Sequence, residues 1–145
     1  YHRIKFFDSS IKSDFLEKKC FIGAGGSLST PVKTPLIYRE EEYNAMLQAL
    51  ACEKKGADGF LISHQPPYNT KTDKIMKVKH VGSKAIRLFI EQYQPLFCLT
   101  GHIHESRGID AIGRTRIVNP GPFKDGRYCR ILIEREYVDV KLERV

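Results

Sequence analysis

The sequence has no tryptophan, only two methionines, and no apolar run close to the length of a membrane-spanning helix. A helix needs roughly 20 consecutive apolar residues to cross a bilayer, so no transmembrane helix is predicted. Internal repeats and low-complexity tracts are also absent. With 41% hydrophobic and 28% charged residues over 145 positions, the composition is that of a globular domain. It excludes disordered and coiled-coil classes.

Paired cysteines are absent as well. The four cysteines form no C-x-x-C motif, and each lies in an apolar stretch: Cys20, Cys52, Cys98 and Cys129. Cysteines placed in this way are typical of reduced core residues rather than of disulfides or zinc ligands. No secretory or transit segment is recognisable. These absences predict a cytoplasmic protein.

Positive charge is in excess, with 24 Lys and Arg against 17 Asp and Glu, which gives a net charge of +7. Six basic residues lie close together, opposed in sequence only by Asp73: Lys71, Lys74, Lys77, Lys79, Lys84 and Arg87. Such a cluster attracts phosphate-bearing ligands. A nucleic-acid-binding module is one alternative. It is not favoured, because no helix-turn-helix pattern and no arginine–aromatic interleaving are present.

The hydrophobic pattern predicts alternating strands and helices. Buried strands are expected at 19–23, 59–63 and 96–100, and helices at 40–54 and 83–93, with Ser83 as an N-cap. Segment 65–82 reads as a long irregular loop. Four strand-like segments separated by turns follow, at 109–112, 115–118, 128–133 and 137–142. This order predicts an α/β fold whose mixed sheet ends in antiparallel hairpins.

Three histidines come directly after predicted buried strands. His64 follows the second strand, and His102 and His104 follow the third. Ligands bind outside the carboxyl ends of strands in open α/β sheets. In extended backbone, His102 and His104 would point the same way, about 6.5–7 Å apart, and Gly101 would allow close approach to a ligand. Because imidazole suits Mn, Fe, Co, Ni and Zn, the pattern predicts a metal site.

Several longer motifs occur in a fixed order with these histidines. They are F-I-G-A-G-G-S at 21–27, S-H-Q-P-P-Y at 63–68, H-V-G-S at 80–83, T-G-H-I-H-E at 100–105 and N-P-G-P at 119–122. The set resembles the C-terminal half of a calcineurin-like metallophosphoesterase of the small prokaryotic type. The resemblance runs from about Phe21 to Ile133. It implies a four-layer α/β/β/α sandwich with a dinuclear metal centre.

The same resemblance implies roles for individual residues. His64 and His102 would bind one metal ion, and His104 the other. The ions would be divalent, Mn first, with Fe, Ni, Co or Zn as alternatives, and metal-bound hydroxide would attack a phosphomonoester or phosphodiester. A small phosphate ester or a nucleotide is the implied substrate. His80 and the nearby lysines would border its entrance, with His80 as a phosphate contact.

The acidic motifs of that family, D-x-H, G-D-x-x-D and G-N-H-D/E, do not occur in this sequence. Three neutral imidazoles would leave two divalent ions with a charge of about +4 and no carboxylate to offset it. We therefore expect residues 1–145 to be the C-terminal part of a single domain, with a preceding part supplying the carboxylates and the catalytic histidine. The alternative is a non-catalytic interaction or regulatory module that kept the fold.

Overall fold

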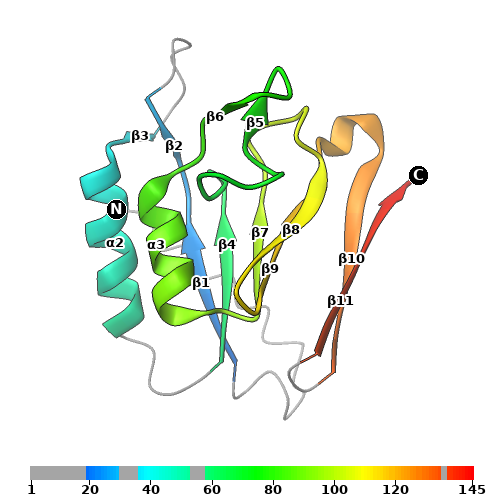
Figure 1. Cartoon of the computed structure of the whole chain (residues 1–145). Coiled ribbons are helices and arrows are strands. Elements are labelled where there is room, and N and C mark those ends of the chain that lie inside the picture. Colours follow the sequence, from blue (N-terminus) through cyan, green and yellow to red (C-terminus); the bar gives the residue numbers. More distant parts are fainter. Residues whose placement is uncertain (1–18, 30–35, 53–57, 135–136) are drawn as a thin grey trace.

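A five-stranded mixed sheet forms the centre of the fold, with the strand order β1-β4-β7-β9-β8 (Figure 1). The structure is a computed structural model that describes residues 19–29, 36–52, 58–134 and 137–145. The strands are β1 (Lys19–Ala24), β4 (Asp58–Ser63), β7 (Phe97–Thr100), β8 (Gly108–Ile112) and β9 (Thr115–Asn119). Four of them are parallel, and β8 pairs antiparallel with β9.

Two helices cover one face of this sheet, α2 (Glu40–Cys52) and α3 (Lys84–Tyr93). Their buried side chains recur at helical spacing and meet the alternate residues of the strands. The main members of this core are Tyr43, Leu47, Ile86, Phe89, Ile90, Ile22, Leu61, Cys98 and Ile117. Ser83 caps α3 as predicted, by accepting from the backbone N–H of Ile86. The core therefore sets how both helices lie against the sheet.

An antiparallel hairpin covers part of the other face. It consists of β10 (Arg127–Glu134) and β11 (Tyr137–Arg144), which follow the short 3-10 helix η1 (Phe123–Asp125). A second core joins the hairpin to the sheet and contains Phe60, Leu96, Phe97 and Val138, with Leu99, Ile131, Ile133 and Val140 against it. Phe21 and Ile62 keep 40% and 44% exposure. The cover on this face is thus incomplete within the described residues.

The predicted α/β class, the mixed sheet and the hairpin ending are confirmed. The irregular loop at 65–82 was a partly wrong prediction, because it contains the short hairpin β5 (Lys74–Ile75) and β6 (Lys79–His80). A second two-residue pair, β2 (Ser27–Leu28) with β3 (Ile37–Tyr38), was also missed. Strands this short leave no periodic pattern in the sequence.

The predicted end of the first helix, beyond Cys52, lies outside the described residues. No described helix is long and apolar enough to cross a membrane.

Candidate metal centre

Two of the three predicted ligands meet at the carboxyl edge of the sheet. His64 directly follows β4, and His102 lies two residues after β7, the strand that pairs in parallel with β4. The His102 Nδ1 and His64 Nε2 atoms are 3.1 Å apart, and the two rings meet edge to face with centroids separated by 4.9 Å. Adjacent parallel strands thus bring together two imidazoles that are 38 positions apart in sequence.

Backbone hydrogen bonds hold His64 in place. Its N–H donates to the carbonyl of Ala24 at 3.0 Å, and its own carbonyl accepts from the N–H of Gly101 at 3.2 Å. The hydroxyl of Thr100 also donates to that carbonyl, at 3.4 Å. These contacts connect the ends of three neighbouring strands. The sheet therefore determines the backbone position of His64.

His102 is held in an unusual backbone conformation. Its φ is +59°, and the N–H of Ile103 donates to the carbonyl of Gly101 at 2.6 Å, which closes a γ-turn around His102. A positive φ is strained for a non-glycine residue, and such strain concentrates at functional sites. The buried amide of Asn119 donates to the carbonyls of Ile103 at 2.9 Å and Gly101 at 3.4 Å. Asn119 thus supports both sides of the strained residue.

The third predicted ligand, His104, is exposed in the turn that follows. The expectation that residues 102 and 104 lie in extended backbone was wrong, because the γ-turn at His102 reverses the chain before His104 is reached. His104 nevertheless lies close enough for its charge to influence both other imidazoles. No group of three or more His, Cys, Asp or Glu side chains that could hold a metal ion occurs among the described residues.

Burial lowers the pKa of both paired histidines below the usual value. For His64 the second cause is the nearby charge of His104. For His102 the further causes are His64 and then His104. Both rings are therefore biased toward the neutral form, which is the form that binds a metal ion. Their spacing fits as well, since two nitrogen ligands at about 2.1 Å from one ion lie about 3.0–3.4 Å apart.

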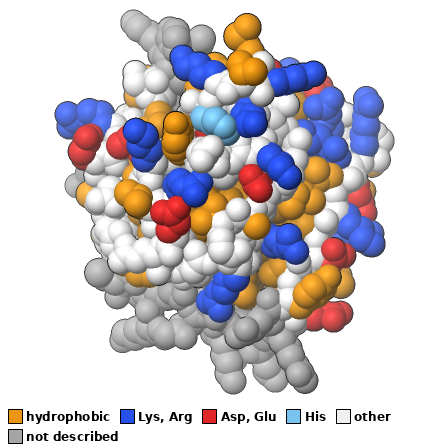
Figure 2. Space-filling model, viewed as in Figure 1, with side chains coloured by type: hydrophobic (Ala, Val, Ile, Leu, Met, Phe, Trp, Pro, Cys, Tyr) orange, Lys and Arg blue, Asp and Glu red, His pale blue; other side chains and the backbone are white. Residues whose placement is uncertain are grey.

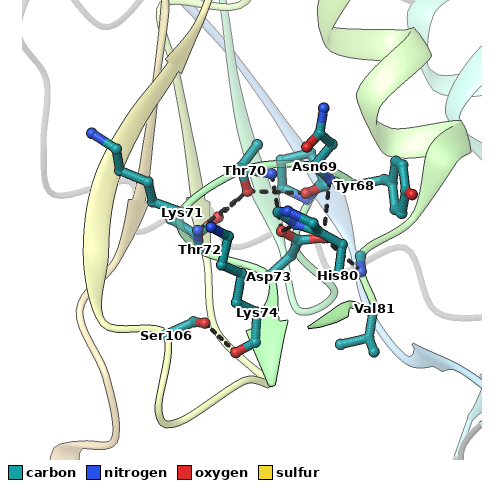
Figure 3. A network of polar contacts seen from close by, with 12 residues as sticks. Tyr68, Asn69, Thr70, Lys71, Thr72, Asp73, Lys74, His80, Val81 and Ser106 are labelled. Carbon is teal, nitrogen blue, oxygen red and sulfur yellow. Dashed lines mark hydrogen bonds and ion pairs between the residues drawn. The ribbon is translucent and has the colours of Figure 1, made fainter. Parts of the chain in front are cut away.

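The fourth predicted site residue, His80, lies in a separate polar network on the loop between β4 and α3. Its Nδ1 is 2.6 Å from a carboxylate oxygen of Asp73 (Figure 3). The same loop follows His64 directly, and the side-chain amide of Gln65 donates to the carbonyl of Val81 at 2.8 Å. His80 thus belongs to the same edge of the sheet as the histidine pair, without an interaction between them.

Three residues that organise this edge were missed as such in the sequence: Gln65, Asp73 and Asn119. All three are polar and almost fully buried, with at most 1% exposure. In the sequence, Asn119 was interpreted only as part of a turn and of a family motif. Asp73 was interpreted only as a single negative charge among lysines. The partners of Asn119 lie in other loops. Those of Asp73 lie in its own loop, three to nine positions away, where the spacing follows no helix or strand period.

Comparison with known proteins agrees with this architecture. Residues 5–145 match the family of metallophosphoesterases of the calcineurin superfamily. The uncharacterised protein MJ1162 of Methanocaldococcus jannaschii is 49% identical over 112 residues, which are 74% of this chain and 50% of that protein. The chain therefore belongs to the calcineurin-like metallophosphoesterase family.

Solved structures show the same relationship. One crystal structure with 28% sequence identity superposes with a TM-score of 0.67 and covers 86% of this chain and 48% of the other. The structure of TT1561 from Thermus thermophilus has 19% identity and a TM-score of 0.58, with 85% and 52% covered, and shows likeness of fold alone. The chain thus spans about half the length of the relatives it matches.

Proposed function

We propose that the protein containing this chain is a metal-dependent phosphoester hydrolase. The observation that carries the proposal is the His64–His102 pair, with nitrogens 3.1 Å apart at the ends of adjacent parallel strands. Membership in a metallophosphoesterase family gives the reaction class. The substrate class that fits is a small phosphate ester or a nucleotide, as a monoester or a diester.

In this proposal His64 and His102 hold one divalent ion and His104 contributes to a second. When bound, the ions supply Lewis-acid stabilisation of phosphoryl oxygens and an activated water; manganese is the first choice, with Fe, Ni, Co or Zn as alternatives. The γ-turn and Asn119 keep His102 in position. The acidic ligands and the catalytic histidine come from a part of the protein outside this chain, which completes a single four-layer domain in the cytoplasm.

The basic surface supports a phosphate substrate. Lys and Arg side chains gather over the region of β5 and β6, above the carboxyl ends of the central strands (Figure 2). Lys71, Lys77 and Lys79 are exposed there, so they remain free to attract an anion. Nucleic-acid binding by the same surface is the less favoured alternative.

The test uses the natural gene product loaded with Mn²⁺, assayed on p-nitrophenyl phosphate and bis-p-nitrophenyl phosphate. The variant is His102→Asn, because asparagine tolerates positive φ better than alanine does. We expect metal content by elemental analysis and kcat/KM to fall together, the latter by more than about 100-fold. Lys124→Ala, at an exposed position of η1, is the matched control and should change neither quantity.

Two results would contradict the proposal. Normal hydrolysis by His102→Asn would remove the site assignment. Wild-type protein without stoichiometric transition metal and without hydrolysis of either ester would instead support the non-catalytic module. A steep loss of nucleic-acid affinity with salt would favour the binding alternative, since log affinity falls by about 0.9 per contacted phosphate.

A further inference from the structure

A buried carboxylate organises the loop that crosses the carboxyl edge of the sheet. Asp73 has no exposed surface, and it accepts backbone hydrogen bonds from Asn69 at 3.0 Å, Thr70 at 2.9 Å and Gly82 at 3.0 Å (Figure 3). Three N–H donors directed at two oxygens leave the carboxyl group an acceptor only, which is its ionised form. Asp73 is therefore a fixed buried negative charge.

The fourth partner of this carboxylate is the imidazole of His80, whose Nδ1 is 2.6 Å from Oδ1. Since Asp73 can only accept, Nδ1 must carry the hydrogen. The Nε2 atom has no hydrogen-bond partner among the described residues. It carries a lone pair when the ring is neutral, and it is a charged donor when the ring holds a second proton. His80 keeps 22% exposure of its side chain, compared with none for Asp73, so the ring is partly accessible.

The loop that carries this pair is tied to both halves of the candidate metal centre. On the His64 side, Ser83 donates to the carbonyl of Pro66 at 2.8 Å, and Tyr68 donates to that of Ser83 at 2.9 Å. On the His102 side, the amide of Asn119 reaches the carbonyl of Thr72 at 3.5 Å as well as the γ-turn. A rigid frame therefore fixes the position of the pair relative to both paired histidines.

Two lysines lie in the neighbourhood of His80. Lys74 stands directly opposite His80 in the β5–β6 hairpin, so both side chains leave the same face. Tyr68 packs edge to face on the imidazole at 5.8 Å, and Lys84 Nζ lies 5.6 Å from the centre of the Tyr68 ring. The ring thus contacts one buried carboxylate, one lysine leaves the same face of the hairpin, and a second lysine lies over the Tyr68 ring that packs on the imidazole. An anion is the ligand that this arrangement suits.

We propose that Asp73 and His80 form an anion-binding pair: Asp73 is a positioning residue that holds Nδ1–H, and protonated Nε2 donates to an oxygen of the substrate phosphate. This deepens the proposed function and rests on it for the identity of the substrate. Binding a dianionic phosphate beside an imidazolium and Lys74 is favourable, while Asp73 offsets the charge on the ring. The proposal predicts that phosphate affinity depends on Nε2, not merely on an intact loop.

Two substitutions distinguish phosphate binding by His80 from a purely structural role, in which His80 only stabilises the β5–β6 hairpin. His80→Asn puts an amide N–H near the place of Nδ1, so it keeps the contact with Asp73 but removes the Nε2 donor. His80→Gln puts its amide near Nε2 and gives up the contact with Asp73. We expect His80→Asn to keep the wild-type melting temperature and His80→Gln to lower it.

The measurements are inhibition of ester hydrolysis by inorganic phosphate in the Mn²⁺-loaded gene product, and KM and kcat for p-nitrophenyl phosphate. Removing one charge-assisted hydrogen bond corresponds to about 10- to 100-fold weaker phosphate binding and higher KM in His80→Asn. Lys124→Ala is the control. If phosphate inhibition and KM in His80→Asn equal those of the wild-type protein, the proposal is overturned and His80 has only a structural role.

A second readout does not depend on catalysis. Inorganic phosphate titrated into metal-free wild-type protein should shift the ¹⁵N resonance of His80 Nε2, and sodium chloride at equal ionic strength should not. An unchanged resonance would overturn the proposal. Because this measurement uses the wild-type protein, it tests the proposal even if His80→Asn fails to fold. If the wild-type protein hydrolyses no ester with any metal, the proposed function fails, and this titration alone decides the role of the pair.

Discussion

Replacing Asp73 by asparagine tests whether one buried carboxylate organises the loop at the edge of the sheet. The substitution keeps the shape of the side chain and removes its charge. Each carboxylate oxygen of Asp73 accepts two hydrogen bonds: Oδ1 from Thr70 and His80, and Oδ2 from Asn69 and Gly82. If the NH₂ group replaces Oδ2, it faces the two backbone donors of Asn69 and Gly82. If it replaces Oδ1, it faces the N–H of Thr70, while a neutral His80 can change tautomer and accept from it through Nδ1.

The cost follows from the number of donors that lose their partner. An unsatisfied buried donor costs about 1–3 kcal/mol, so the loss of one or two of them amounts to about 1–6 kcal/mol. A domain of this kind is stabilised by only about 5–15 kcal/mol in total. The Asp73→Asn variant should therefore lose a large share of its free energy of unfolding.

Urea denaturation followed by circular dichroism measures this loss, with Glu91→Gln as the control. Glu91 accepts from Arg87 at 2.8 Å in an exposed i, i+4 pair, which is worth about 0.3–0.5 kcal/mol. Amide hydrogen exchange should show the largest acceleration at Asn69, Thr70 and Gly82. A loss no greater than that of Glu91→Gln, with unchanged exchange at these amides, would show that Asp73 does not organise the loop.

Three further predictions concern packing, thiol chemistry and pH. Gly82→Ala should destabilise the protein by about 1–3 kcal/mol in the same urea assay, because the added Cβ would lie 2.6 Å from the backbone of Pro67. In the control Gly108→Ala, the added Cβ meets nothing within 4 Å, so this variant should be nearly neutral. Burial raises the pKa of the Cys98 thiol to about 12, so peptide mapping should find it unalkylated in native protein at pH 8 and modified after unfolding; native labelling would contradict its burial. The pKa values of His64 and His102 lie below 6.5 in the folded state, so the unfolded chain binds more protons than the folded one at acidic pH. The free energy of unfolding of metal-free protein should therefore fall as pH drops below about 6.5, and an unchanged urea midpoint between pH 7.5 and 5.5 would contradict this.

The larger elements of the fold were predictable because their signals are local. Continuous apolar runs indicated β4 and β7, and helical spacing with a serine cap indicated α3. The β5–β6 hairpin was not predictable in this way. Its strands have two residues each, and it is held in place by contacts of Asp73 with His80, of Ser106 with Lys74 and of Glu105 with Met76.

For the site, the ordered motifs were enough to predict the family. The three histidines that follow strands were predictable as well, because strand ends in a parallel sheet share one edge. The sequence did not reveal that His64 and His102 meet while His104 stays exposed, because a positive φ at His102 and the hydrogen bonds of Asn119 turn the chain before His104. Nor did it reveal that Asp73 is buried against His80. The contacts of His102 and Asn119 join residues of different segments, and burial gives the Asp73–His80 contact a strength that its position in the sequence does not reveal.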